Sequence, residues 1–339
     1  MSVIIKRCSV GERITCGRET LLCAGATDDG RMLTVRSWKD APDTSSCQLG
    51  DFHTFAPTVR QLRKDQGDMH DAYAEHGVNE LFGKHEGKSI IIVANGPSIT
   101  RYVDVIRELR EKHGHIVIGV NAAMKYGFHN CMDYYMVLCW LTQKWWWTGY
   151  DTSKIPCVTS FGSTVDVIRD FPNRYYYDEA FIDIIAEKPE SRKKYGCLDG
   201  GVSVTYSAYH LAYKMGASRI ILAGVDCAYT DNMDHPDDPL TWEKAKRRQV
   251  YPVCDINGKA VLTDKTLMMQ HDLMKAQTVF VEEDGIPVIN ISGGGILDIG
   301  GRMTAHEYLD TVRKQEAEGG TFMVKQKEVS HGGVPAGVK

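Results

Sequence analysis

Residues 89–98 read Ser-Ile-Ile-Ile-Val-Ala-Asn-Gly-Pro-Ser, and this stretch decides the fold. Its run of β-branched apolar residues, 90–93, is typical of a strand that is covered on both faces, as in a parallel sheet. Apolar residues at helical spacing follow, from Tyr102 to Leu109. The stretch therefore predicts a strand, a tight turn at residues 95–98 and a helix.

The turn Asn95-Gly96-Pro97-Ser98 has the features of a phosphate-binding turn. Gly96 lets a ligand approach the backbone closely, and Ser98 is a good N-cap for the helix, whose positive end would face an anion. Any α/β protein also needs tight turns, so this pattern alone leaves both interpretations open. The chain contains neither a Gly-x-x-x-x-Gly-Lys-Ser/Thr sequence nor a Gly-x-Gly-x-x-Gly sequence, which excludes a P-loop and leaves classical NAD binding unsupported.

Composition narrows the class of protein. The 339 residues carry a formal net charge of −4, which gives no general attraction for nucleic acid or an anionic membrane. No apolar run is long enough for a membrane span, and the N-terminal residues lack the apolar core of a signal peptide. The ten cysteines are scattered without a Cys-x-x-Cys pair. This pattern favours reduced thiols in a cytoplasmic protein.

From residue 88 onward the chain alternates between predicted strands and helices. The predicted strands are residues 90–93, 116–120, 134–138, 156–160, 174–177, 219–224 and 287–290. Helices are expected after Gly200-Gly201, ending at Gly216, and over residues 266–283. This alternation predicts an α/β fold over residues 88–315, a Rossmann-like, doubly wound, mainly parallel sheet. Such sheets bind ligands beyond the carboxyl ends of their strands.

The two ends of the chain differ from this pattern. Residues 1–87 read as a small β-rich N-terminal appendage and linker, with a hairpin signal at Asp29-Gly30. A homo-oligomer contact or an acceptor-binding flap would each fit the appendage. Residues 229–260 read as a polar loop, and residues 316–339 as a flexible tail.

Polar residues collect where the predicted strands end. They are Asn95, Gly96, Pro97, Ser98, Asn121, Trp140, Asp226, Asn290, Ser292 and Gly293. Asparagine side chains supply donors and acceptors for a base, a ribose or a sugar, although asparagine also tolerates turns. A repeated pattern at strand ends favours ligand binding. A second anion site is open at Gly200, Gly201 and Ser203, where an N-cap and close helix packing fit equally well.

The segment after residue 225 is rich in oxygen ligands. Asp226, at a strand end, could bind a ribose hydroxyl, hold a metal ion or act as a base. The acidic residues that follow could hold Mg²⁺ or Mn²⁺, but a solvated acidic loop accounts for them better; with a histidine, they are Asp231, Asp234, His235, Asp237 and Asp238. Lys244 and Arg248 then either neutralise phosphates or lie on an exposed helix face.

Aromatic and histidine residues complete the candidates. Three consecutive tryptophans, residues 145–147, cannot all face one core, so Trp146 is expected at a pocket or interface together with Tyr229. His235 and His271 are the histidines to consider for acid–base chemistry.

The motifs together resemble one superfamily. They are Ile-Ile-Val-Ala-Asn-Gly-Pro-Ser-Ile, Gly-Val-Asn-Ala-Ala, Gly-Gly-Val-Ser-Val-Thr-Tyr-Ser-Ala-Tyr and Arg-Ile-Ile-Leu-Ala-Gly-Val-Asp-Cys-Ala-Tyr-Thr-Asp, in this order over residues 88–300. This pattern is similar to the MptE-like (6-hydroxymethylpterin diphosphokinase-like) proteins and the motility-associated flagellin glycosyltransferases. More distantly it is similar to the family 42 sialyltransferases.

The resemblance implies a Rossmann-like domain that binds a nucleotide-activated donor, which is a CMP-sugar, a UDP-sugar or ATP. It places nucleotide contacts at Asn95 and Asn121 and a functional residue at Asp226. The sialyltransferase catalytic histidine has no secure counterpart, since His271 falls near it but out of register. Because Pro97 has no amide hydrogen, we expect the turn to hold the nucleotide through its other three residues, with the chemistry on the opposite side.

Three hypotheses follow. The favoured one is a glycosyltransferase that uses a nucleotide sugar, for an acceptor that the sequence does not name. The second is an ATP-dependent diphosphokinase acting on a pterin-like alcohol, for which Mg²⁺ would be the cofactor and Asp226 a candidate ligand. The third is a nucleotide-binding protein without catalysis.

Overall fold

The computed structural model describes residues 68–138, 144–179, 194–200 and 203–319, together with the backbone of four short strands before them. These strands are β1 (Arg13–Cys16), β2 (Glu19–Ala26), β3 (Met32–Arg36) and β4 (Cys47–Gln48). They form an antiparallel sheet in chain order. The predicted hairpin is confirmed by the pairing of β2 with β3, although its turn at Asp29-Gly30 lies outside the described residues.

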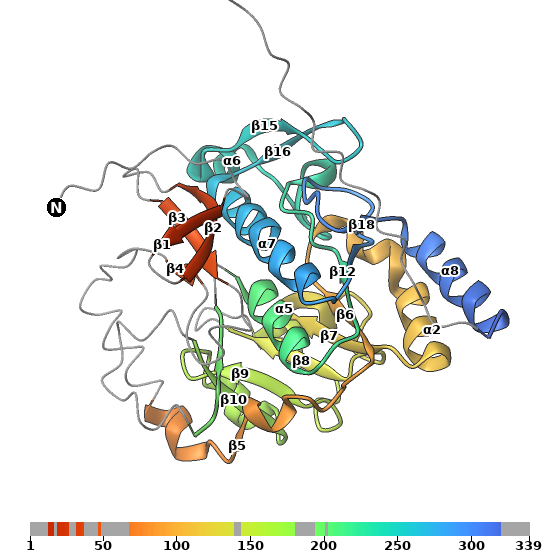
Figure 1. Cartoon of the computed structure of the whole chain (residues 1–339). Helices are drawn as coiled ribbons and strands as arrows, with labels where there is room; N and C mark the ends of the chain where they lie inside the picture. The colour runs from red at the N-terminus through yellow and green to blue at the C-terminus, as the bar shows by residue number, and fades with distance from the viewer. Residues whose placement is uncertain are drawn as a thin grey trace, which may run out of the picture.

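A parallel sheet forms the centre of the molecule (Figure 1). Its strand order is β11-β10-β9-β8-β7-β6-β12-β17-β18, with β5 also paired to β10, and every pair is parallel. The bounds are β5 (His76–Gly77), β6 (Ser89–Val93), β7 (Ile116–Val120), β8 (Tyr134–Val137), β9 (Cys157–Ser160), β10 (Arg174–Glu179), β11 (Cys197–Leu198), β12 (Arg219–Ala223), β17 (Val288–Asn290) and β18 (Gly301–Arg302). The predicted α/β fold class is confirmed.

Helices cover both faces of this sheet because alternate strand residues point to opposite sides. Ile90 and Ile92 of β6 pack with the helices α5 (Val204–Lys214) and α7 (Lys265–Glu283). Ile91 and Val93 pack with the helices α2 (Val103–His113) and α8 (Ala305–Ala317) on the other face. These four side chains are fully buried, so the apolar run that identified the strand is the centre of two cores.

The strand order reverses at β6, because β7 lies on one side of it and β12 on the other. After β6 the chain continues to α2 on one face of the sheet. After β12 it continues to α7 on the opposite face. A doubly wound sheet opens its ligand crevice at such a point, beyond the carboxyl ends of the strands.

Local predictions are confirmed in part. The helices predicted after Gly200-Gly201 and over residues 266–283 are α5 and α7. Ser98 was expected to cap a helix, but Gly96 is the N-cap residue of a 3₁₀ helix, η2 (Pro97–Tyr102), and α2 begins only at Val103.

The prediction of a polar loop at residues 229–260 was also wrong, because this segment is folded. It contains η5 (Thr230–Asn232), β13 (Met233–His235), β14 (Asp238–Pro239), α6 (Trp242–Arg248), β15 (Tyr251–Cys254) and β16 (Ala260–Thr263). The strands pair as two antiparallel hairpins, β13–β14 and β15–β16. Its polar composition hid these hairpins, because their strands are mostly half-buried or exposed.

The remaining elements are short. They are η1 (Val78–Leu81), η3 (Asn121–Met124), η4 (Lys144–Trp146) and α3 (Asp166–Asp170). At the other end of the chain, helix α8 extends to Ala317, and the rest of the predicted tail, residues 320–339, lies outside the described residues.

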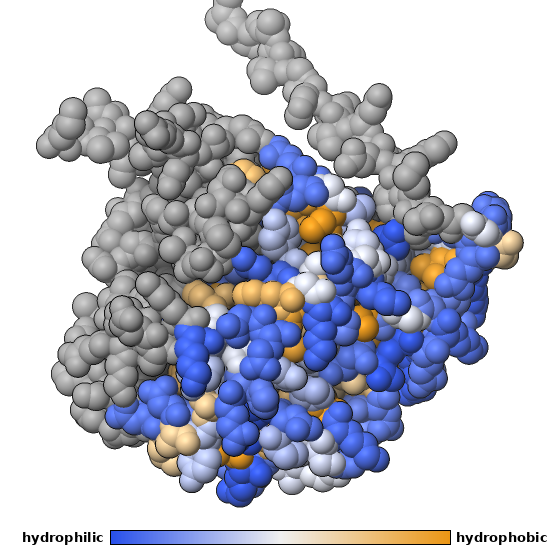
Figure 2. Space-filling model, turned by 60° about the horizontal axis from the view of Figure 1, so that its bottom comes forward, coloured by the Kyte–Doolittle hydropathy of each residue, from blue (hydrophilic) through white to orange (hydrophobic). Residues whose placement is uncertain are grey.

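On the face seen in Figure 2 the described residues are mostly hydrophilic, with apolar side chains scattered among them. None of the helices in the described part of the chain is both long and apolar enough to cross a membrane.

Two histidines are buried where elements meet. The His115 Nε2 atom lies 3.0 Å from the Tyr308 hydroxyl of α8, and the His70 Nε2 atom lies 3.1 Å from the Ser163 carbonyl oxygen. Burial lowers the pKa of each imidazole to about 4. Both side chains are therefore neutral in the folded protein at neutral pH.

Acidification should therefore destabilise the fold. Between about pH 6.5 and pH 4 the unfolded chain binds a proton at each histidine and the folded protein does not, so stability falls as the pH is lowered. Each histidine should cost about 3 kcal/mol of unfolding free energy by pH 4. Urea unfolding across this range should show a weaker pH dependence for His115→Gln than for the wild type. The exposed His306 of α8 offers the control, His306→Gln, which should behave as wild type. Equal pH dependence in all three proteins would contradict the assignment.

Candidate functional site at the carboxyl edge of the sheet

A buried carboxylate joins the loops that follow β6 and β12. The Ser98 hydroxyl donates a hydrogen bond to Asp226 Oδ1 at 2.6 Å, and the Ser98 amide donates to Asp226 Oδ2 at 3.2 Å. Asp226 is only 2% exposed. Desolvation raises the pKa of this carboxyl, against the hydrogen bonds from Ser98, which lower it. Both oxygens thus hold the turn, and the side chain faces the protein interior.

Glycines let three loops approach this carboxylate. A Cβ atom on Gly96 would lie 2.6 Å from Asp226 Oδ1, and one on Gly295 would lie 2.1 Å from the Asp226 carbonyl oxygen. The Ile296 amide donates to that carbonyl oxygen at 2.8 Å. The glycines of the turn and of the loop after β17 are therefore needed for close packing between loops.

The turn has few amides left for a phosphate. The Gly96 amide donates to the Gly224 carbonyl oxygen at 2.7 Å, and the Ile99 amide donates to the Gly96 carbonyl oxygen at 3.1 Å. The Ser98 amide is bound to Asp226, and Pro97 has none. In this arrangement residues 96–99 give a phosphate no free backbone donor, so the positive helix end is not an open anion site.

Two asparagine side chains lie at this edge with a buried, unpaired oxygen. Asn95 follows β6 and Asn121 follows β7, and these strands are neighbours. The Oδ1 atoms of both side chains are buried and accept no hydrogen bond within the part of the chain that the structure describes. An unsatisfied buried acceptor costs about 1–3 kcal/mol. Such a pair is suited to a ligand that donates hydrogen bonds, as a base amino group or a ribose hydroxyl does.

The backbone at Asn121 has an unusual conformation. Its φ angle is 47°, in the left-handed region, and the Tyr135 hydroxyl donates to its carbonyl oxygen at 2.6 Å. Strained backbone of this kind persists where the surroundings fix it, often at ligand sites. It turns the residue away from the direction of β7.

The folded segment after β12 reaches this edge through its first hairpin. The His235 Nδ1 atom lies 3.2 Å from the Asn95 carbonyl oxygen. Because a carbonyl oxygen only accepts hydrogen bonds, the Nδ1 atom carries the proton, and the Nε2 atom of the neutral ring is then the basic one. Arg101 of η2 forms an ion pair with Asp231 of η5 at 2.7 Å. These contacts hold the segment against the β6 turn.

The acidic residues of this segment are each paired with a basic side chain, and the side chains of Asp231, Asp237 and Asp238 remain 44–45% exposed. The pairs are Asp231 with Arg101 and Lys259, Asp234 with Arg248, Asp237 with Lys125, and Asp238 with Lys244. Across the described ranges no group of three or more His, Cys, Asp and Glu side chains suits a metal ion. The sequence analysis did not identify Lys125 as the partner of Asp237. The feature that could have indicated it is its position four residues after Asn121.

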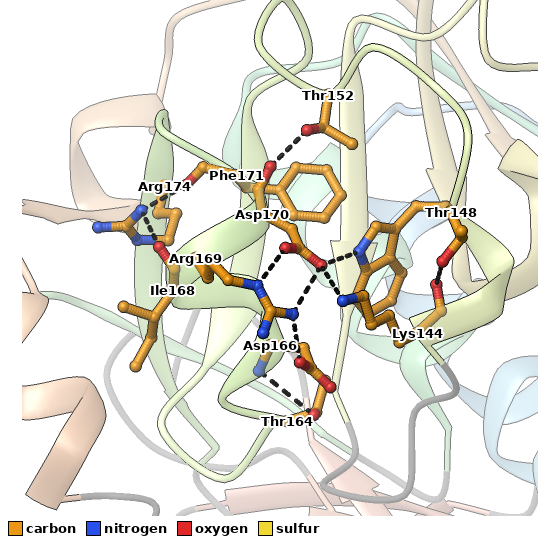
Figure 3. A network of polar contacts seen from close by, with 11 residues as sticks. Lys144, Thr148, Thr152, Thr164, Asp166, Ile168, Arg169, Asp170, Phe171 and Arg174 are labelled. Carbon is orange, nitrogen blue, oxygen red and sulfur yellow. Dashed lines mark hydrogen bonds and ion pairs between the residues drawn. The ribbon is translucent and has the colours of Figure 1, made fainter.

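The three tryptophans do not all face one core, as expected. Trp147 is 2% exposed and its Nε1 atom donates to Asp170 Oδ2 at 2.9 Å, in a polar network that also includes Arg169 and Lys144 (Figure 3). Trp145 is 51% exposed and Trp146 is half-buried, in edge-on contact with the Trp145 ring. Trp147 thus anchors the segment, and Trp145 faces solvent. Trp140 lies outside the described residues.

Several predicted ligand contacts make bonds within the protein. The Asn290 side chain binds the Leu297 carbonyl oxygen and the Ser292 amide, and Ser292 Oγ accepts from the Val225 amide. A Cβ atom on Gly293 would lie 2.1 Å from the Tyr102 hydroxyl oxygen. These residues shape the loop after β17.

The other predicted residues lie elsewhere. The Tyr229 hydroxyl donates to Asp264 and accepts from Arg248, and the ring is buried. Ser203 is the N-cap of α5 and follows the buried Gly200, whereas Gly201 lies outside the described residues. His271 lies on α7 with its Nδ1 atom 2.8 Å from Asp272 Oδ1.

Comparison with known proteins supports the resemblance that the motifs indicate. Residues 67–232 match the family described as 6-hydroxymethylpterin diphosphokinase MptE-like. Over these residues the chain is similar to the MptE-like family. The resemblance inferred from the motifs is thereby confirmed, and the MptE-like region contains Asn95, Asn121 and Asp226.

A solved structure shares the fold over most of the chain. It is the MAf glycosyltransferase from Magnetospirillum magneticum AMB-1, with a TM-score of 0.51 and 16% sequence identity. The match covers 72% of this chain and 39% of that protein, so this chain corresponds to less than half of its length. At this identity the match shows the fold alone. No curated protein matches the chain.

Replacing the buried carboxylate should destabilise the edge. Asp226→Asn removes one of the two acceptors for Ser98 and should lower the free energy of unfolding by about 1.5–3 kcal/mol in urea. Asp104→Asn, at a side chain 93% exposed, is the control and should change it by less than about 0.5 kcal/mol. If Asp226→Asn kept full stability yet abolished ligand binding, Asp226 would be a ligand contact instead.

Proposed function

We propose that the chain is a nucleotide-dependent transferase, and specifically a glycosyltransferase that moves a sugar from a nucleotide-sugar donor to an acceptor. The observation that carries this proposal is the pair of buried, unpaired Oδ1 atoms on Asn95 and Asn121 at the switch point of the sheet. The MptE-like resemblance of residues 67–232 and the fold shared with a glycosyltransferase support it.

The nucleoside is the part of the ligand that best fits these oxygens. Base amino groups and ribose hydroxyls are donors, and the two asparagines follow adjacent parallel strands, which lie about 5 Å apart. A nucleoside lying across the ends of β6 and β7 would pair both oxygens and relieve the cost of leaving them unsatisfied. CMP-, UDP- and ATP-type ligands all carry such donors.

His235 is the group best suited to be the general base. Its ring is oriented by the Asn95 carbonyl oxygen, which leaves Nε2 to accept a proton. In the transfer the acceptor hydroxyl gives its proton to Nε2, its oxygen bonds to the anomeric carbon, and the nucleotide leaves with its phosphate. Asp226 supports this arrangement by positioning the turn, since both its oxygens already bind Ser98.

A diphosphokinase is the second candidate, favoured by the description of the matching family. It would require Mg²⁺ held between carboxylates and the ATP phosphates. Asp226, the predicted ligand, is buried against Ser98 and fits that role poorly. The carboxylates of residues 231–238 would first have to leave their basic partners.

A thermal-shift screen separates the candidates. We expect a nucleotide sugar of the CMP, UDP or GDP series to raise the melting temperature without Mg²⁺, because binding to the folded state alone stabilises it. Stabilisation by ATP only in the presence of Mg²⁺ would favour the diphosphokinase. Binding without any turnover would leave a nucleotide-binding protein, and no response to any nucleotide would refute the proposal.

The same screen tests the asparagine pair. Asn121→Ala should reduce the shift given by the selected nucleotide, with about a tenfold loss of affinity for one hydrogen bond in a dry site. Its melting temperature without ligand should stay close to the wild-type value. Asn257→Ala, at an exposed residue of the β15–β16 turn, is the matched control. Unchanged affinity in Asn121→Ala would remove this residue from the nucleotide site.

Loss of the base should affect rate more than binding. His235→Gln should lower the rate of donor hydrolysis, with water as the acceptor, by about 10²–10⁴-fold while the dissociation constant changes little. His271→Gln should keep the wild-type rate. A loss of rate in His271→Gln with none in His235→Gln would reverse the assignment.

A further inference from the structure

Lys125 and Tyr126 hold the two oxygens of a single carboxylate. Lys125 Nζ contacts Asp237 Oδ2, and the Tyr126 hydroxyl donates to Asp237 Oδ1 at 2.7 Å. The two donors come from the segment after β7, and the carboxylate comes from the turn of the β13–β14 hairpin, 112 residues later. A cation and a hydroxyl that grip two oxygens of one anion form an anion-binding site.

This anion site adjoins the asparagine pair. Lys125 follows η3, which begins at Asn121. Its carboxylate partner Asp237 is two residues after His235, whose Nδ1 atom lies 3.2 Å from the Asn95 carbonyl oxygen. The site is thus connected to Asn121 along one segment and to Asn95 through the hairpin.

An indole holds the cation in place. Lys125 Nζ lies 4.0 Å from the centre of the Trp145 ring, a favourable cation–π contact. The tryptophan segment is itself fixed by the hydrogen bond from Trp147 to Asp170. Lys125 is thus oriented by a group other than Asp237, and it can keep its place when the carboxylate moves away.

The carboxylate is exchangeable. The Asp237 side chain is 45% exposed and that of Lys125 is 28% exposed, and ion pairs with this much solvent contact are weak. Partial burial opposes ionisation of Asp237, but the hydrogen bonds from Lys125 and Tyr126 outweigh it and lower the pKa of this carboxyl. Asp237 is therefore an anion at neutral pH, which a more highly charged anion can displace.

We propose that Lys125 and Tyr126 form the subsite for the phosphate groups of the ligand, and that Asp237 occupies this subsite until the ligand displaces it. The inference rests on the proposed function and extends it. It also accounts for the Gly96–Ser98 turn, whose amides are already bound within the protein. Binding would release the β13–β14 hairpin from the segment after β7.

Titration calorimetry of the full chain with inorganic diphosphate at low ionic strength tests the subsite without a base. Asp237→Asn removes the competing charge and keeps the size of the side chain. It should bind diphosphate about 2- to 5-fold more tightly than the wild type, since the gain equals the strength of an exposed ion pair. Adding Lys125→Met to Asp237→Asn should abolish binding.

The neighbouring carboxylate gives the matched control. Asp238 is also 45% exposed and is paired with Lys244 instead of Lys125. Asp238→Asn removes the same charge one residue away and should leave diphosphate affinity at the wild-type value. All variants should show wild-type melting temperatures within a few degrees, because the substituted side chains are partly exposed.

Four results would overturn the inference. They are an equal gain in Asp238→Asn, no gain in Asp237→Asn, binding that persists in the Lys125→Met double variant, and no diphosphate binding in any protein. The thermal-shift screen with nucleotides is independent of the diphosphate titration, because it tests nucleoside binding at Asn95 and Asn121. If the protein binds a nucleotide but Asp237→Asn leaves diphosphate affinity unchanged, only the phosphate subsite is refuted. If no nucleotide stabilises the protein in the screen, the proposed function is refuted.

Discussion

The hydrogen bonds between Asp226 and Ser98 are the constraint on which the edge of the sheet depends. They join the loops after β6 and β12, which carry the chain to opposite faces of the sheet. A carboxylate taken out of water is costly unless its oxygens are bound, so the turn must keep its hydroxyl and amide pointed inward. The glycines around Asp226 follow from the same contact, because any side chain there would collide with it.

This constraint determines what is left for a ligand. Backbone amides of the turn are consumed within the protein, so the usual way in which a helix end binds phosphate is closed. Among the described residues, the buried side-chain oxygens of Asn95 and Asn121, which follow neighbouring strands, are left unsatisfied at this edge. At this edge a ligand would therefore be bound by side chains instead of backbone amides. The part of the ligand that these side chains bind would be hydrogen-bond donors instead of phosphate oxygens.

The charged segment after β12 complements this arrangement. Asp231 and Asp237 pair with Arg101 and Lys125, which follow β6 and β7, whereas Asp234 pairs with Arg248 inside the segment. One of these pairs involves Lys125, beside Asn121, where a carboxylate occupies the place of an external anion. A segment held by partly exposed ion pairs can be released by a competing anion, since water screens each pair.

The sequence by itself determined seven strands of the central sheet, because β-branched runs covered on both faces need no distant information to be recognised. It did not reveal the short strands β5, β11 and β18 or the two hairpins after β12. It also determined the order of strands and helices, and with it the fold class, and the motifs that resemble the MptE-like family. Only the tertiary structure decided which polar atoms are used and which are left over. Asp226 and Ser98 lie 128 residues apart, and Lys125 and Asp237 lie 112 apart. Such partners come together only when whole elements pack. The local patterns predicted a capped helix and a solvated loop, and they do not identify these distant partners.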